Sequence, residues 1–232
     1  MNIKLENVAI IPARIGSKRI KKKNIKFFFG KPILQWTYET IRKSKIFDKI
    51  ALTSDSDEVL NIGKKIGFDI LIKRPKKLSN DYAGTVPVIK HAINYLSHQF
   101  ILTKKICCIY PCNPFVHEKD LSKANKLVSK NLNNFVYAIT NYSHPVERSL
   151  HFDSSNNKLT NVYKKFTNVR TQDLKKSFYD AGQFYFASTK IWLNMKKIIY
   201  LGIPIPNWRV VDIDTIEDWK RAKILFSVLK KY

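Results

Sequence analysis

The sequence has few cysteines and no long apolar segment, and both absences narrow its class. Its 232 residues include three cysteines at positions 107, 108 and 112, an odd number that excludes the paired framework of a disulfide-rich secreted protein. They lack the spacing of a zinc site. Apolar runs such as residues 8–12 are far shorter than the ~20 residues of a membrane span, and residues 1–6 lack a signal-peptide core. We therefore expect a cytoplasmic protein without membrane contact.

Acidic residues are also scarce, since 18 Asp and Glu stand against 42 Lys and Arg and give a net charge of +24. Such a charge first suggests a nucleic acid, an anionic membrane or a phosphorylated substrate. Most of the cations are lysines spread along the chain, which is typical of solvated helix faces. Only residues 18–23 (KRIKKK) concentrate the charge directly after an expected strand. This concentration of charge favours a small phosphorylated substrate. The alternative, a nucleic-acid partner, predicts DNA or RNA affinity that falls steeply with salt concentration.

Short β-rich runs alternate with amphipathic segments along the chain. Hydrophobic residues make up 44% of the sequence, enough for one core and too many for a disordered chain. Strands are expected at 8–12, 50–53, 68–72, 106–110, 135–140, 182–186 and 210–214, and helices at 31–44, 57–66, 85–99, 118–130 and 215–230. This alternation predicts an α/β fold, a three-layer αβα sandwich with a mostly parallel, Rossmann-like sheet that binds ligands at the carboxyl ends of its strands.

Residues 141–178 break the alternation. They are polar, rich in Asn, Ser and Lys, and contain only short strand-like runs. No linker divides the chain, so we expect a single domain over residues 1–232 with a small inserted excursion. Such an insertion commonly carries substrate specificity or a dimer contact.

A basic loop follows the first expected strand at residues 11–24 (IPARIGSKRIKKKN). Gly16 permits a tight turn, and Arg14, Lys18 and Lys23 supply charges for a polyphosphate. Neither G-x-x-x-x-G-K-[ST] nor G-x-G-x-x-G is present, which excludes the two common phosphate loops. The alternative is a basic surface loop with a turn glycine, but its position at a strand end favours phosphate binding.

Two carboxylates, Asp212 and Asp214, lie two residues apart in an expected strand. Alternate residues of a strand share one face, and paired carboxylates suit Mg²⁺ that is bound together with substrate phosphates. The alternative is helix capping, because Asp214 or Thr215 precedes an expected helix with acids in its first turn. The acidic run 54–58 is better explained by capping alone. A basic loop and an acidic pair at the ends of one sheet suggest nucleotidyl transfer.

The motifs resemble those of the cytidylyltransferases that activate nonulosonic acids, the relatives of sialic acid. Residues 11–24 are similar to the family pattern I-P-A-R-G-G-S-K-x-I-P-x-K-N, and residues 30–32 (GKP), 52–55 (LTSD), 73–75 (KRP) and 212–215 (DIDT) follow in the family order. Residues 107–111 (CCIYP), 142–148, 170–174 (RTQDL) and 180–185 (DAGQFY) are nearest to the branch that acts on pseudaminic acid.

The resemblance implies a nucleotidyltransferase that moves CMP from CTP to the anomeric 2-hydroxyl of a nine-carbon 2-keto sugar acid, with Mg²⁺, in a homodimer. It places the catalytic residues at Arg14, Lys18, Lys23 and Asp212. It places nucleotide contacts at Arg14, Gly16, Ser17, Lys18, Lys23, Asn24 and Arg74, and metal ligands at Asp212 and Asp214. It places sugar-acid contacts at Tyr110, Arg170, Gln172, Asp180 and Gln183.

Three positions depart from the family pattern. Ile15 replaces a glycine and would be strained at positive φ, Lys21 replaces a proline, and Cys112-Asn113 replaces Thr-Ala or Thr-Ser. These departures leave two alternatives open: the same reaction on legionaminic or N-acetylneuraminic acid, and a catalytically idle homologue that only binds nucleotide.

Overall fold

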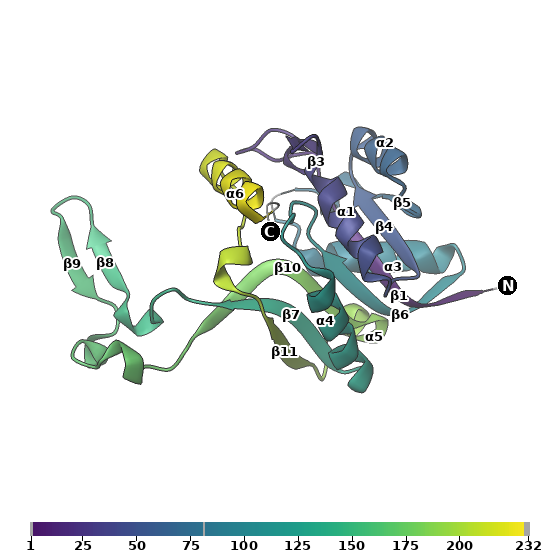
Figure 1. Cartoon of the computed structure of the whole chain (residues 1–232). Helices are drawn as coiled ribbons and strands as arrows, with labels where there is room; N and C mark the ends of the chain where they lie inside the picture. The colour runs from purple at the N-terminus through teal and green to yellow at the C-terminus, as the bar shows by residue number, and fades with distance from the viewer. Residues whose placement is uncertain (1, 81, 230–232) are drawn as a thin grey trace.

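A seven-stranded sheet forms the centre of the computed structural model, which describes residues 2–80 and 82–229 (Figure 1). Its strands are β1 (Ile3–Pro12), β4 (Lys49–Ser54), β5 (Ile70–Lys73), β6 (Ile101–Ile109), β7 (Asn134–Asn141), β10 (Phe178–Ser188) and β11 (Ile199–Pro204), in the order β11-β7-β10-β6-β1-β4-β5. All neighbouring strands are parallel except β10, which is antiparallel to β6 and β7. The predicted mostly parallel sheet is therefore confirmed.

Helices cover both faces of this sheet and complete the three layers. One face packs against α1 (Ile33–Ser44), α2 (Asp57–Ile66) and α4 (Glu118–Lys130), and the other against α3 (Thr85–His98) and α5 (Thr189–Asn194). The last helix, α6 (Ile216–Leu229), packs with a third buried cluster that includes Phe28 and Ile33.

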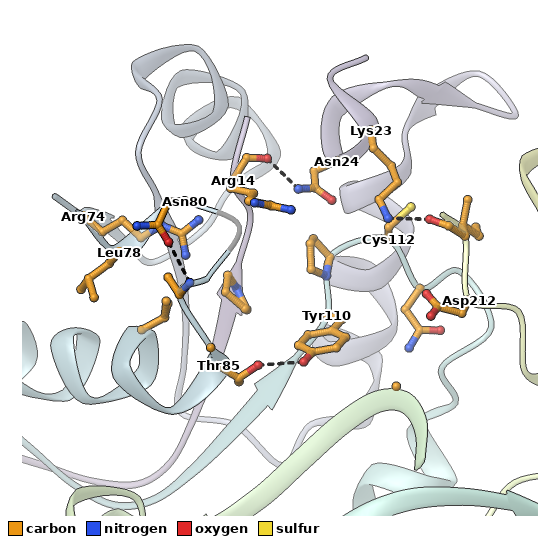
Figure 2. A pocket seen from close by; sticks show the side chains of 18 of the residues that line it. Arg14, Lys23, Asn24, Arg74, Leu78, Asn80, Thr85, Tyr110, Cys112 and Asp212 are labelled. Carbon is orange, nitrogen blue, oxygen red and sulfur yellow. Dashed lines mark hydrogen bonds between the residues drawn. The ribbon is translucent and has the colours of Figure 1, made fainter. Parts of the chain in front are cut away.

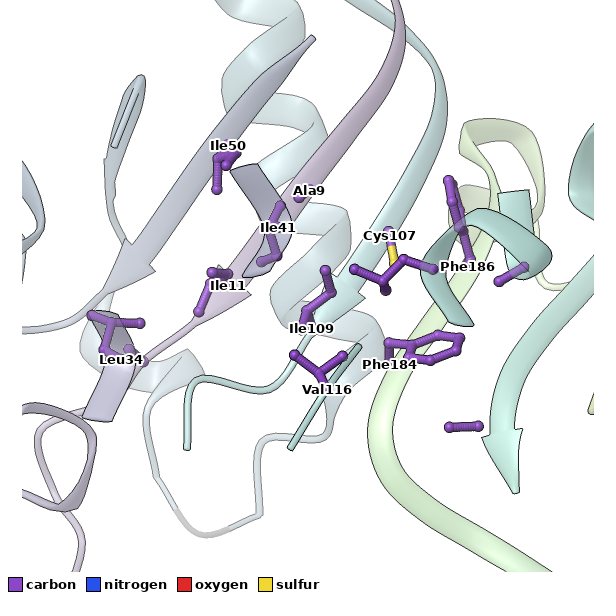
Figure 3. Packing of buried hydrophobic residues seen from close by; sticks show 14 of the residues in the cluster. Ala9, Ile11, Leu34, Ile41, Ile50, Cys107, Ile109, Val116, Phe184 and Phe186 are labelled. Carbon is purple, nitrogen blue, oxygen red and sulfur yellow. The ribbon is translucent and has the colours of Figure 1, made fainter. Parts of the chain in front are cut away.

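The apolar run at the end of β1 explains why the sheet lies in the middle. Ala9 and Ile11 point into the cluster shared with α1, α2 and α4, which Figure 3 shows. Val8 and Ile10 point the opposite way, into the cluster shared with α3 and α5. All four are fully buried, because a parallel strand between two helix layers has no solvent face.

The chain between β7 and β10 extends away from the sheet as an arm (Figure 1). It carries the hairpin of β8 (Leu150–Asp153) and β9 (Lys158–Asn161), whose residues are all exposed. A second small hairpin, β2 (Phe27–Phe28) with β3 (Lys31–Pro32), precedes α1. Short 3₁₀ turns occur at Lys23–Ile25, Lys76–Leu78, Val146–Arg148, Lys164–Phe166, Thr171–Asp173 and Asn207–Arg209.

The prediction of a strand at residues 210–214 is wrong. These residues belong to no strand and pair with none in the described chain. The edge of the sheet is instead β11, which the sequence reading did not predict, as it did not predict α5. Val211 and Ile213 are buried in the cluster around α6, while Asp212 is exposed. The alternation of apolar and acidic residues thus serves packing against a helix.

A capping box starts α6. Thr215 Oγ1 accepts a hydrogen bond from the Asp218 amide at 3.2 Å, and Asp218 Oδ2 accepts one from the Thr215 amide at 2.8 Å. This reciprocal pair satisfies two amides that a helix N-terminus leaves without partners. Of the two capping candidates that the sequence offered, Asp214 and Thr215, the reciprocal pair identifies Thr215.

Loss of the Thr215 hydroxyl should weaken this start. We expect Thr215→Ala to lower the free energy of unfolding by about 1 kcal/mol at pH 7, measured by urea denaturation. The Thr215 hydroxyl and amide hold the pKa of Asp218 below its usual value, so the cap stabilises the fold above that pKa and is lost as the pH falls through it. The variant should therefore also bring the Asp218 pKa back toward its ordinary value, which an NMR titration of that carboxyl would detect. An unchanged titration would contradict this assignment.

None of the helices in the described ranges 2–80 and 82–229 combines the length and the apolar character needed to cross a membrane.

Candidate active site

A pocket of about 320 Å³ opens where several strands of the sheet end (Figure 2). Pro12 closes β1, Tyr110 follows β6 and Arg74 follows β5, and all three line it. Gly84 and Thr85, at the start of α3, form part of the same wall. The carboxyl ends of parallel strands therefore meet at this pocket, as the α/β pattern predicts.

Two arginines face the pocket from one side. Arg74 is only 5% exposed, and its Nη2 lies 4.0 Å from Asp55 Oδ1. Burial and the nearby charge of Arg14 lower the pKa of Arg74, while Asp55 raises it; an arginine nevertheless stays protonated in a protein. Figure 2 shows the guanidinium of Arg14 entering the same space. Two arginines at one wall of a pocket are suited to bind a polyanion.

The basic loop is held in place by hydrogen bonds at its two ends. The Asn24 side chain, which is buried, donates to the Arg14 carbonyl at 2.8 Å, and the Ile15 amide donates to Asp55 Oδ1 at 3.2 Å. Ile15 is not among the described residues with positive φ, so the glycine-to-isoleucine departure causes no backbone strain; Lys22 has the left-handed conformation instead, with a φ of 52°.

An acidic segment forms the opposite wall. Asp212 lines the pocket, and its pKa is raised by partial burial and by the nearby charge of Asp214. In the described chain no donor makes a hydrogen bond to the Asp212 carboxylate. Asp214 is instead bound by two cations, with Lys23 Nζ at 3.0 Å and Arg19 Nη2 at 2.6 Å.

The two aspartates therefore have different electrostatic environments. Burial alone would raise the pKa of Asp214, but the hydrogen bond and charge of Lys23, together with the charge of Arg19, lower it. Lys23 Nζ also donates to the carbonyl of Ile213. The expectation that both carboxylates point to one place from a strand is thus replaced by an arrangement in which Asp212 faces the pocket and Asp214 pairs with Lys23 and Arg19.

The floor of the pocket is aromatic and polar. The Tyr110 hydroxyl lies 2.8 Å from Thr85 Oγ1, and burial raises its pKa. Asn113 is 5% exposed, and its Nδ2 has no partner within the described residues, which leaves a buried donor at the pocket wall. Cys112-Asn113, singled out as a departure from the family pattern, does line the pocket, whereas sequence reasoning missed Asn80 and Thr85 as lining residues. Their position after a strand or before a helix is the signal that could have identified them.

The structure brings together only part of the predicted site. The residues that line the pocket are Arg14, Lys23, Asn24, Arg74, Tyr110 and Asp212, whereas Gly16, Ser17, Lys18, Asp214 and Gln183 do not line it. Asp180 lies in a neighbouring groove beside Tyr179 and Tyr185, and accepts a hydrogen bond from the Tyr185 hydroxyl at 2.7 Å. Gln183 is 2% exposed and donates to the Arg209 carbonyl at 3.0 Å.

Two further predicted sugar contacts lie on the arm. Arg170 is exposed and pairs with Asp173, with 2.8 Å between Nε and Oδ2. Gln172 lines a separate hollow at the base of the arm together with Tyr142 and His144. Within one copy of the chain these two side chains are therefore apart from the pocket.

The cysteines do not form a metal centre. Cys107 and Cys108 are completely buried in β6, on opposite faces of the sheet. Cys112 lines the pocket, and burial raises the pKa of its thiol to about 12, with nearby Asp212 contributing. The described residues contain no group of three or more His, Cys, Asp or Glu that could hold a metal ion.

Comparison with known proteins identifies related sequences over nearly the whole chain. The family model described as cytidylyltransferase matches residues 8–228. The pseudaminic acid cytidylyltransferase of Campylobacter jejuni is 37% identical over 227 residues, which cover 97% of each protein. A Helicobacter pylori protein named as pseudaminic acid cytidylyltransferase and UDP-2,4-diacetamido-2,4,6-trideoxy-beta-L-altropyranose hydrolase is 33% identical over 219 residues, 94% of this chain and 41% of its own.

The fold has counterparts among solved structures. A CMP:2-keto-3-deoxy-manno-octonic acid synthetase complexed with CTP superposes with a TM-score of 0.71, covering 97% of this chain and 99% of the other. At 12% sequence identity this likeness concerns the fold alone. It agrees with the three-layer architecture described above.

Proposed function

This chain belongs to the cytidylyltransferase family, and on that premise we propose that it transfers CMP from CTP to the anomeric 2-hydroxyl of a nonulosonic acid, pseudaminic acid, and releases pyrophosphate. The observation that carries the proposal is the opposition of two arginines and a carboxylate across one pocket, Arg14 and Arg74 against Asp212. The relatives named as pseudaminic acid cytidylyltransferases support the choice of sugar.

In the proposed reaction the oxygen of the sugar 2-hydroxyl forms a bond to the α-phosphorus of CTP. The bond from that phosphorus to the bridging oxygen breaks, pyrophosphate leaves with the electron pair, and the proton of the attacking hydroxyl is released to solvent. Arg14 and Arg74 bind the phosphate oxygens and balance the charge that develops there. Lys23 contributes a further cation at the opposite wall, and Asn24 holds the backbone of the basic loop through the Arg14 carbonyl.

The acidic wall fits a magnesium ion. Mg²⁺ is commonly held by one or two carboxylates together with substrate phosphates, rather than by a complete protein cage. Asp212 faces the pocket without a hydrogen-bond donor from the described chain, and Asp214 follows two residues later. We propose that Asp212 would hold Mg²⁺, which would supply charge neutralisation at the phosphates. Asp214 would join it only by giving up its pairs with Lys23 and Arg19, so Asp212 is the principal ligand in this proposal.

The proposed sugar acid lies between the pocket and the neighbouring groove. Tyr110 forms the pocket floor and makes a ring contact with Tyr185, with 5.5 Å between centroids, and Tyr185 in turn contacts Asp180. A polyol that enters from the groove would therefore meet hydroxyl and carboxylate groups on its way to the α-phosphate. Gly16, Ser17 and Lys18 remain proposed contacts for the outer part of the triphosphate.

We also propose that the enzyme is a homodimer in the cytoplasm. The hairpin on the arm exposes Leu150, Phe152 and Leu159, by 52–62%, which is unusual for large apolar side chains gathered on one small hairpin. Arg170 and Gln172 belong to the same arm. In a dimer they would contact the sugar acid that is bound in the pocket of the other subunit. The three cysteines are free thiols, as expected in a reducing compartment.

Relative rates with three sugar acids test the substrate assignment. Pyrophosphate release from CTP and Mg²⁺ should be fastest with pseudaminic acid and slower with legionaminic and N-acetylneuraminic acid at equal concentrations. A faster rate with either of the other two would reassign the substrate within the same chemistry.

A further inference from the structure

The segment that carries Asp212 is packed through Val211 and Ile213, which are buried in the cluster around α6, but few polar contacts fix its backbone. Residues 210–215 belong to no helix or strand, so no sheet ladder fixes their position. Downstream, Lys23 donates to the Ile213 carbonyl and the capping box starts α6. Upstream, the Val210 amide donates only to the nearby Asn207 carbonyl, at 3.0 Å. The nearest upstream residue with polar contacts to other elements is Arg209, three residues before Asp212.

Arg209 forms a largely buried ion pair with α4. Its Nη2 lies 2.8 Å from Asp120 Oδ2, and the side chains of the two residues are 15% and 6% exposed. Asp120 belongs to the first turn of α4, on the face of the sheet that carries α1 and α2. Separating such a pair would leave a buried charge without compensation, which costs free energy. The pair therefore holds the Arg209 side chain against α4.

The backbone of Arg209 is held as well. Its carbonyl accepts a hydrogen bond from Gln183 Nε2 at 3.0 Å, and Gln183 is almost completely buried. The carbonyl of Gln183 in turn accepts a hydrogen bond from the Tyr110 amide at 3.1 Å. Arg209 therefore connects α4 and β10 to the acidic segment, and through Gln183 to the residue that forms the pocket floor.

The geometry points to Arg209 as the positioning residue for Asp212: its buried pair with Asp120 and its carbonyl bond to Gln183 set where the metal-binding carboxylate lies. This inference rests on the proposed role of Asp212. Three residues span at most about 11 Å, so a shift at Arg209 passes directly to Asp212. Side chains that orient metal ligands commonly affect metal affinity by about 10–100-fold when they are removed.

The inference also gives Gln183 a different role from the predicted sugar contact. Its side-chain amide donates to the Arg209 carbonyl, and Gln183 does not line the pocket. It therefore acts on the site through Arg209 and not by touching the sugar.

Binding of Mn²⁺ in the presence of CTP tests the inference without turnover. Arg209→Met should weaken Mn²⁺ binding, followed by EPR of free Mn²⁺, by at least about tenfold, while CTP binding in EDTA changes less than twofold. Arg209→Lys keeps the charge but loses the guanidinium fork. Its Mn²⁺ affinity should therefore lie between those of Arg209→Met and the unmodified chain. Asp120→Asn should give the same defect as Arg209→Met, and the double variant should add little to it because both residues act as one unit.

Arg42→Met is the matched control. Arg42 also pairs with an aspartate, Asp69, at 2.5 Å, but lies outside the pocket. It should lose folding stability without losing Mn²⁺ affinity. Equal Mn²⁺ affinity in Arg209→Met and the unmodified chain, or equal losses in Arg209→Met and Arg42→Met, would overturn the positioning role. If Arg209→Met does not fold, Arg209→Lys and Asp120→Asn decide by the same criterion.

The Mn²⁺-binding experiment and the test of CMP transfer can fail independently. An unmodified chain that binds Mn²⁺ with CTP but transfers CMP to no nonulosonic acid would refute the function, and the variants would still decide the role of Arg209. An unmodified chain that binds no Mn²⁺ with CTP would overturn the inference itself.

Discussion

Asp212→Asn should lower kcat/KM for CMP transfer by about 10²–10³-fold, or about 3–4 kcal/mol of transition-state stabilisation. The amide keeps the size of the side chain but removes the negative charge that faces the pocket. CTP binding in EDTA should persist, because the arginines on the other wall are unchanged. Steady-state kinetics at several Mg²⁺ concentrations would measure the effect.

Folding should not explain this loss. The pKa of Asp212 is raised by partial burial and by Asp214, so ionisation of this carboxyl disfavours the folded state above that pKa. The neutral amide should therefore keep or slightly increase the free energy of unfolding at pH 7. Asp57→Asn is a suitable control, because Asp57 is an exposed carboxylate paired with Lys73 outside the pocket. CMP transfer by Asp212→Asn within fivefold of the unmodified chain would contradict the metal role of Asp212. No CMP transfer by the unmodified chain itself would indicate a homologue that only binds nucleotide.

Arg74→Met should raise the dissociation constant of CTP by about 10–100-fold, because a hydrogen bond to a charged group contributes about 1.5–3 kcal/mol. Arg74 is buried at the pocket wall, and its Nη2 lies 4.0 Å from Asp55 Oδ1. Calorimetric titration with CTP would measure the change.

Lys73→Met tests whether charge alone is responsible. Lys73 is adjacent in sequence but exposed, and its partner is Asp57. This variant lowers the net charge by the same amount and should leave CTP affinity within about twofold, since exposed ion pairs contribute little. Equal losses in the two variants would indicate a general electrostatic effect and contradict a specific contact at Arg74.

Much of the fold could be predicted because its helices and inner strands have regular patterns. The helix boundaries at 57–66 and 118–130 coincide with α2 and α4, where apolar residues recur at helical spacing between clear ends. β11 and α5 were missed because each has only six residues, too few for a helical or strand period to be distinguished. The acidic segment 210–214 was misassigned because Val211 and Ile213 alternate as in a strand but pack against α6.

Site residues could be predicted where a polar or charged side chain directly follows a strand. They could not be predicted where their role depends on contacts between distant parts of the chain. Arg14, Arg74 and Tyr110 each follow a strand, and the topology brings them to one pocket. The pair of Arg209 and Asp120 joins residues 89 positions apart, which no local pattern reveals. For the same reason Gln183 was predicted as a sugar contact although its side chain is buried against Arg209.

The positive charge of the chain is also clearer in three dimensions. Of the +24 net charge, the residues relevant to the proposed reaction are a few cations at the pocket, chiefly Arg14, Lys23 and Arg74. The charge therefore supports a small triphosphate as the anionic ligand, and a nucleic acid is not needed to explain it.

Phosphorus NMR of a reaction containing CTP, Mg²⁺ and pseudaminic acid tests the central claim most directly. The three CTP signals should be replaced by one phosphodiester signal of the CMP-sugar and by pyrophosphate in equal amounts, because the sugar hydroxyl attacks the α-phosphorus. Formation of free CMP and pyrophosphate, or no reaction with pseudaminic, legionaminic or N-acetylneuraminic acid, would contradict transfer of CMP to a nonulosonic acid.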